Sequence, residues 1–90
     1  MFLTPHQIGE YVAAANRLDS LANELEAAEI IPAEAATRLI QTMELLIEID
    51  SGLHKLREKL DEIHAKRSTT PEQIRKFVEF LRTEVRIAEQ

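Results

Sequence analysis

Five polar side chains are spaced so that they would share one stripe of a helix. They are Asp50, His54, Arg57, Asp61 and His64, which follow one another at intervals of four, three, four and three residues. Residues three or four apart are neighbours on a helix surface. Asp61 and His64 also have the carboxylate-x-x-His spacing that di-metal helical bundles use for their ligands. This stripe is the strongest candidate for chemistry in the chain.

Two features of the sequence argue against a metal at this stripe. A di-metal bundle needs further inward carboxylates from the facing helices, whereas the inward positions here are leucine and isoleucine. Arg57 also lies in the middle of the stripe, where its charge would repel a cation. We therefore interpret the five residues as a solvated or interfacial polar stripe, and we predict no metal site and no cofactor.

The other residue types that carry catalysis form no recognisable set. The chain has no cysteine, and therefore no thiolate nucleophile or disulfide framework. Its serines stand outside any nucleophile-elbow context, and Gly9 and Gly52 are isolated, so no glycine-rich loop is present to hold phosphates. We predict that the protein is not an enzyme and has no catalytic residues.

Three prolines divide the chain into helices. Each stands where the first residue of a helix is expected, because the missing N–H costs no hydrogen bond there. Thr4 and Gln7 have capping-box spacing, as do Thr70 and Gln73. Apolar residues then recur at intervals of three and four. The spacing predicts helices over residues 5–29, 32–66 and 71–88 within a single helical domain, 1–90.

The second of these helices carries a coiled-coil pattern. Leucines recur every seven residues, with a second series three residues further on, which is typical of the a and d positions of heptads. The predicted seam consists of Leu39, Leu46, Ile49, Leu53, Leu56, Leu60 and Ile63. Ser51-Gly52 interrupts the pattern and is the expected place for a bend, because glycine weakens a helix.

The lengths of the predicted helices favour self-association. Two flanking helices would cover a central helix of this length only in part, so much of its seam would need a second chain. We therefore expect an all-α fold of three antiparallel helices with a long central coiled-coil-like helix, completed by dimerisation. The predicted oligomer or partner interface consists of Ile40, Met43, Ile47, Leu53, Leu56, Leu60, Ile63, Phe80 and Ile87.

Charge is unevenly distributed along the chain, whose formal net charge is −5. Residues 1–52 have a net charge of −7 and residues 53–90 a net charge of +2. Two copies packed antiparallel would place the acidic half of one chain beside the basic half of the other. Helix-dipole complementarity and i,i+4 pairs within one chain explain part of the same asymmetry.

These observations predict a protein–protein interaction module: a small regulator, inhibitor or assembly subunit that acts through helix faces as an antiparallel homodimer. The alternative is a transcriptional or nucleic-acid-associated regulator that uses the basic C-terminal half, or an acidic decoy of nucleic acid that uses the N-terminal half. Interleaved glutamates and aspartates disfavour direct binding to nucleic acid. No apolar run is long enough to span a membrane, so we expect a cytoplasmic protein with an unidentified protein partner.

Overall fold

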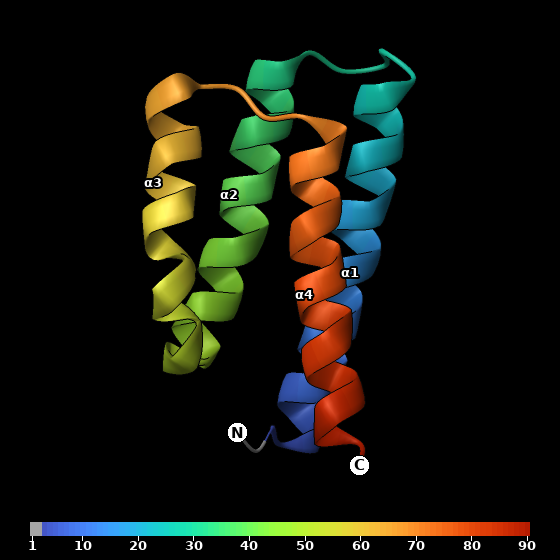
Figure 1. Ribbon diagram of the computed structural model, residues 1–90, viewed down its shortest axis with the longest axis vertical. Coiled ribbons are helices and arrows are strands. Elements are labelled where there is room, and N and C mark those ends of the chain that lie inside the picture. The colour runs from blue at the N-terminus through green and yellow to red at the C-terminus, as the bar shows by residue number, and fades with distance from the viewer. Residues whose placement is uncertain (1–2) are drawn as a thin grey trace.

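The computed structural model describes residues 3–90, and in it the chain forms an all-helical bundle. Consecutive helices run antiparallel, so the start of α1 and the end of α4 lie at the same end of the bundle (Figure 1). The bundle measures 37 × 23 × 16 Å. Its elements are α1 (Pro5–Glu26), α2 (Pro32–Ile49), the 3-10 helix η1 (Ser51–Leu56), α3 (Arg57–Lys66) and α4 (Pro71–Ala88).

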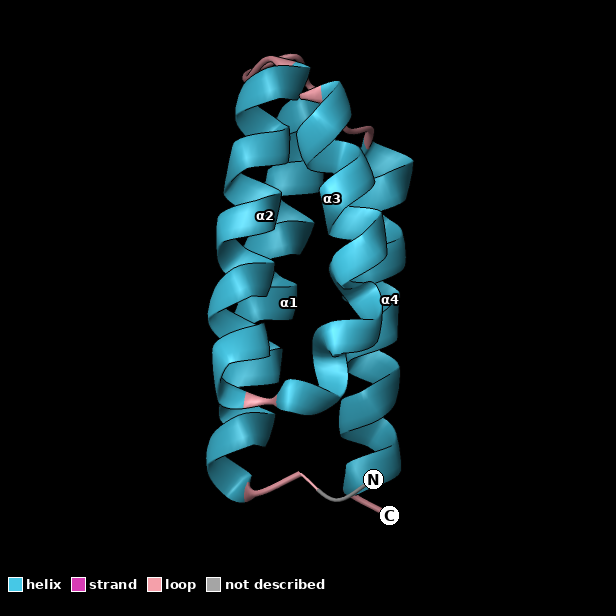
Figure 2. Ribbon diagram, turned by 90° about the vertical axis from the view of Figure 1, so that its left-hand side faces the viewer, coloured by secondary structure: helices cyan, strands magenta, loops and turns pink. Residues whose placement is uncertain are grey.

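The prediction of one long helix over residues 32–66 is wrong in the middle of this segment. α2 ends at Ile49, Asp50 adopts an extended backbone with φ −142° and ψ 99°, and the chain reverses through η1 into α3. Figure 2 shows η1 crossing from the end of α2 to the start of α3. The reversal lies next to Ser51-Gly52, where the sequence predicted a bend. Residues 3–90 therefore form four α-helices where three were expected.

Burial of the predicted seam explains why the chain folds back. Leu39, Leu46, Leu53 and Leu60 are all at most 2% exposed within the single chain, and Ile63 is buried with them. The prediction was wrong for Ile49, which is 40% exposed at the end of α2, and Leu56 is only half-buried. A straight helix would leave many of these side chains in water, at a cost of about 1.5–3 kcal/mol for each. The reversal lets α3 cover α2, so the premise from which we expected a dimer does not hold for this fold.

The sequence predicted the first residues of the helices better than their last residues. The capping box of Thr4 and Gln7 is present, and Thr70 accepts a hydrogen bond from the Gln73 backbone N–H. α4 has the predicted bounds. α1 ends three residues earlier than expected, because Ala28 adopts a left-handed backbone with φ 59°. The N–H groups of Ala28 and Glu29 then donate to the carbonyls of Leu25 and Glu24, which is a Schellman motif.

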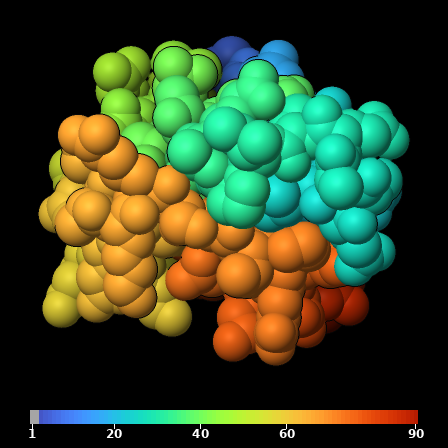
Figure 3. Space-filling model, turned by 90° about the horizontal axis from the view of Figure 1, so that it is seen from above, coloured from blue at the N-terminus to red at the C-terminus, as the bar shows by residue number. Residues whose placement is uncertain are grey.

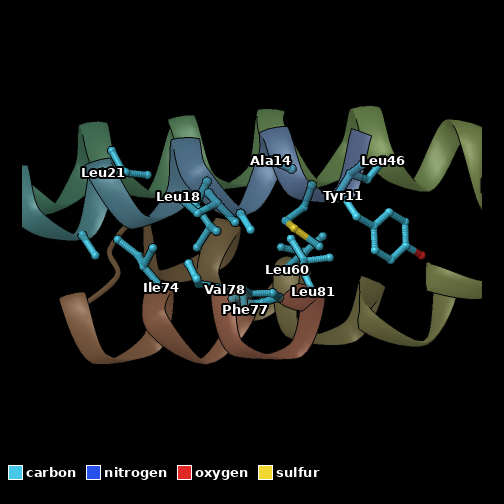
Figure 4. Packing of buried hydrophobic residues seen from close by; sticks show 14 of the residues in the cluster. Tyr11, Ala14, Leu18, Leu21, Leu46, Leu60, Ile74, Phe77, Val78 and Leu81 are labelled. Carbon is cyan, nitrogen blue, oxygen red and sulfur yellow. The ribbon is translucent and has the colours of Figure 1, made fainter. Parts of the chain in front are cut away.

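The four helices are not equally close to one another. α1 packs along α4 and α2, and α3 packs against α2, but α3 and α4 have almost no close backbone approach. Between α1 and α4, the side chains of Leu18, Leu21, Ile74 and Val78 interlock (Figure 4). One side of the bundle is consequently open. Among the described residues, no helix has both the length and the apolar character that a membrane crossing requires.

Candidate functional site

The open side of the bundle forms a groove between α3 and α4, which we call the α3–α4 groove. Viewed from above, a notch separates α3 from α4 (Figure 3). The groove has a volume of about 290 Å³. Its apolar residues are Leu56, Ile63, Phe77 and Phe80, and its polar residues are Lys59, Glu62, Gln73 and Lys76. Leu56 and Phe80 are only half-buried, so the groove presents apolar surface to solvent.

The rim of this groove is basic, although the protein is acidic. Lys59 and Lys76 line it, and Lys55 Nζ lies 5.2 Å from the centroid of the Phe80 ring, in a cation–π arrangement. Within residues 3–90, neither Lys59 nor Lys76 lies at ion-pair distance from a carboxylate. Glu62 is the only acidic residue among those that line the groove.

A larger groove, of about 650 Å³, runs between α1 and α4. Side chains of α4 reach across to α1 at its edge. Arg75 donates to both carboxylate oxygens of Glu26 at 2.8 and 3.2 Å, and Arg82 lies 3.8 Å from Asp19. The Arg75 guanidinium holds the pKa of the Glu26 carboxyl below its usual range. The charges at this groove are thus already largely paired within the chain.

The polar stripe predicted on one helix is divided by the chain reversal. Asp50 caps the turn, while His54, Asp61 and His64 are exposed and Arg57 lies 3.4 Å from Glu44 of α2. Within the described part of the chain, no three His, Cys, Asp or Glu side chains are grouped closely enough to hold a metal ion.

Asp50 is instead part of a buried polar contact that the sequence analysis missed. The Tyr11 hydroxyl donates to Asp50 Oδ2 at 2.6 Å, and Asp50 Oδ1 accepts from the Gly52 backbone N–H at 2.9 Å. Burial and the neighbouring carboxylate raise the pKa of the Tyr11 hydroxyl well above its ordinary value. In addition, Gln7 Nε2 donates to the Ile49 carbonyl at 3.3 Å. These bonds attach the first turns of α1 to the α2–η1 reversal.

The predicted interface residues fall into two groups in the structure. Met43, Ile47, Leu53, Leu60 and Ile63 are buried in the core of the single chain, so their apolar character is accounted for without a partner. The others reach the surface to different degrees: Ile40, Leu56 and Phe80 are half-buried, and Ile87 is 53% exposed. Of these, Leu56 and Phe80 meet in the α3–α4 groove, together with the buried Ile63.

The basic rim was not predicted as a site; the sequence indicated only that the C-terminal half as a whole is basic. Lys55 and Lys59 precede the chain turn into α4, and Lys76 follows it, so they come together only because α3 and α4 are antiparallel neighbours. The available signal was the spacing of Lys55 and Lys59 beside Leu56 on one helix, which places both amines at the edge of an apolar stripe.

No match was found when the chain was compared with protein-family models, with curated proteins and with solved structures. The function must therefore be argued from the geometry of the chain.

Proposed function

We propose that this protein is a non-enzymatic interaction module that binds an acidic amphipathic helix of a partner protein in the α3–α4 groove. The observation that supports this proposal is the pairing of exposed apolar surface with a basic rim on an acidic protein. Helix-in-groove recognition places apolar side chains at i, i+3, i+4 and i+7 into such a groove. Acidic residues on the flanks of the partner helix would then face Lys55, Lys59 and Lys76.

The arrangement of the helices supports a helical occupant. α3 and α4 are antiparallel, and an incoming helix could lie along them as the helices of a bundle lie along one another. The groove volume of about 290 Å³ suits insertion of a few side chains rather than enclosure of a whole ligand. Half-buried Leu56 and Phe80 supply the apolar surface that such insertion would remove from water.

The alternative of nucleic-acid binding is less well supported. Four arginines already lie within 4 Å of carboxylates of the same chain: Arg38, Arg57, Arg75 and Arg82. A phosphate backbone would have to displace these carboxylates, and the net charge of −5 opposes its approach. The three rim lysines also surround an apolar floor, which suits side chains better than phosphates.

Two synthetic helical peptides test the proposal directly. The first carries leucine at i, i+3, i+4 and i+7 with glutamate on its flanks, and the second replaces each glutamate by lysine. We expect the acidic peptide to bind and to shift the amide NMR signals of Leu56, Ile63, Phe77 and Phe80. We expect the basic peptide to bind at least tenfold more weakly, a difference of about 1.4 kcal/mol.

Charge reversal in the protein provides the matched control. Lys59→Glu should weaken binding of the acidic peptide and strengthen binding of the basic one, because it changes the sign of charge at the rim. Arg17→Glu makes the same change in net charge on the exposed face of α1, away from the groove, and should leave both affinities nearly unchanged.

Four results would overturn the proposal. Equal affinity for the two peptides would show that the basic rim does not select the partner. An equal loss of affinity in the Lys59 and Arg17 variants would show that only the net charge of the protein matters. Signal shifts confined to the α1–α4 groove would place binding elsewhere. A dimer of the wild-type protein that Phe80→Ala dissociates would assign the α3–α4 groove to a second copy of the chain.

A further inference from the structure

The α2–η1 reversal is a short connection within a heptad pattern that predicts one long helix. Between Ile49 and Ser51, Asp50 alone is non-helical, and helical structure resumes at once on its far side. The heptad series runs through the reversal, with Leu46 before it and Leu53 and Leu60 after it. The heptad pattern therefore predicts a straight helix where the folded chain reverses, and Ser51-Gly52, which weakens a helix, lies at the point of the reversal.

The two halves of the chain that this residue joins pack mainly on each other. α1 packs along α4, and α2 packs against α3, so most of the core lies between residues 5–49 and residues 57–88. Three of the four ion pairs within the described part of the chain also join the halves: Arg57 with Glu44, Arg75 with Glu26, and Arg82 with Asp19. The acidic and basic halves of the sequence are thus complementary surfaces within one bundle.

We infer that the chain forms a domain-swapped dimer in which residue 50 becomes helical and α2, η1 and α3 join into one helix. In this dimer, residues 57–88 of each copy pack on residues 5–49 of the other. The two joined helices lie antiparallel, because α2 and α3 are antiparallel in the closed chain (Figure 1). Every contact between the halves forms again, with the two partners now on different chains.

Three hydrogen bonds hold the closed form at the reversal. Asp50 accepts from Tyr11 and from the Gly52 backbone N–H, and Gln7 donates to the Ile49 carbonyl. A continuous helix engages the Gly52 N–H and the Ile49 carbonyl within its own backbone ladder. The cap by Asp50 is therefore specific to the closed chain, and its loss shifts the balance toward the dimer. This inference is independent of the occupant of the α3–α4 groove.

The test compares variants at the reversal by light scattering after refolding at low and at high protein concentration. Tyr11→Phe/Asp50→Ala removes both partners of the buried bond together with the cap. We expect it to raise the dimer association constant by about thirtyfold, since each of two chains loses a cap. The dimer should persist after dilution, because its exchange requires the two halves to separate.

Ser51→Pro is the opposing variant. Proline suits the first position of η1 and the extended backbone of Asp50 that precedes it. In a continuous helix it would lie in the interior, where it clashes with the carbonyl four residues earlier. We therefore expect Ser51→Pro to remain monomeric after refolding at high concentration, with an unchanged circular dichroism spectrum.

Two outcomes would overturn the inference. If the wild type and Tyr11→Phe/Asp50→Ala are both monomeric after refolding at every concentration, no swapped dimer exists. If a dimer forms equally in Ser51→Pro, or dissociates at once on dilution, it is a surface dimer and not a swapped one.

Discussion

The hydroxyl of Tyr11 lies 2.6 Å from a carboxylate oxygen of Asp50, thirty-nine residues further along the chain, and both residues are buried. Figure 4 shows the Tyr11 ring beside Leu46, with its oxygen at the far tip from α1. This bond connects the first helix to the point where the chain reverses. Because both partners are buried, the loss of either one leaves a polar group without its hydrogen bond.

A double-mutant cycle measures the strength of this bond. Tyr11→Phe leaves Asp50 with the Gly52 N–H as its remaining partner, and Asp50→Ala leaves a buried hydroxyl without an acceptor. Each variant should lower the free energy of unfolding in urea by about 1–3 kcal/mol. The double variant should cost less than the sum, with a coupling of about 1.5–3 kcal/mol. Strict additivity would mean that the bond contributes nothing in solution.

The raised pKa of Tyr11 makes stability fall at alkaline pH. The unfolded chain releases this proton near pH 10, whereas the folded chain holds it to higher pH. Above pH 10 the unfolded state therefore binds fewer protons, and the free energy of unfolding falls by at most about 1.4 kcal/mol per pH unit. Tyr11→Phe removes the contribution of this hydroxyl to the pH dependence of stability and serves as the control.

The same titration has a direct optical readout, because Tyr11 is the single tyrosine of the chain. Tyrosinate absorbance of the folded protein should rise at distinctly higher pH than that of the protein unfolded in urea. Coincident curves for the folded and unfolded protein would show that the hydroxyl is not held by Asp50.

The left-handed residue that ends α1 is a position where glycine should be better than the native side chain. Ala28 has φ 59°, a conformation that glycine adopts without steric cost. Ala28→Gly should therefore raise the free energy of unfolding by roughly 1 kcal/mol. Ala27→Gly is the matched control, because Ala27 has φ −79° and gains nothing from glycine. A stabilisation of equal size in both variants would contradict the Schellman ending.

Two leucines of α2 test the placement of the core. Leu39 is fully buried, whereas Leu45, on the same helix, is 59% exposed. Leu39→Ala should lower the free energy of unfolding by about 2–5 kcal/mol, and Leu45→Ala should change it by no more than about 0.5 kcal/mol. Thermal and urea unfolding of the two variants provide the measurement. A large loss at Leu45 would indicate that this face of α2 is covered in solution, as in an oligomer.

The local features of the chain were predictable from sequence. Prolines and threonine caps located the starts of three helices, because these signals act over three or four residues. Of the predicted seam, Leu39, Leu46, Leu53, Leu60 and Ile63 are buried, whereas Leu56 is half-buried and Ile49 is exposed. The stop of α1 was missed, since an alanine in a left-handed conformation leaves no signal in the sequence.

Only the tertiary structure decided how that apolar seam is covered. The periodicity of apolar residues indicates which face of a helix must be buried, but not which segment covers it. A straight helix paired with a second chain and a chain that folds back on itself satisfy the pattern equally well. The choice depends on contacts between distant residues, such as Tyr11 with Asp50 and Gln7 with the Ile49 carbonyl. The α3–α4 groove was likewise not predictable, because Lys59 and Lys76 become neighbours only after the chain has turned from α3 into α4. The spacing of residues in the sequence determined which face of each helix is apolar. Packing between distant residues determined which helix covers that face.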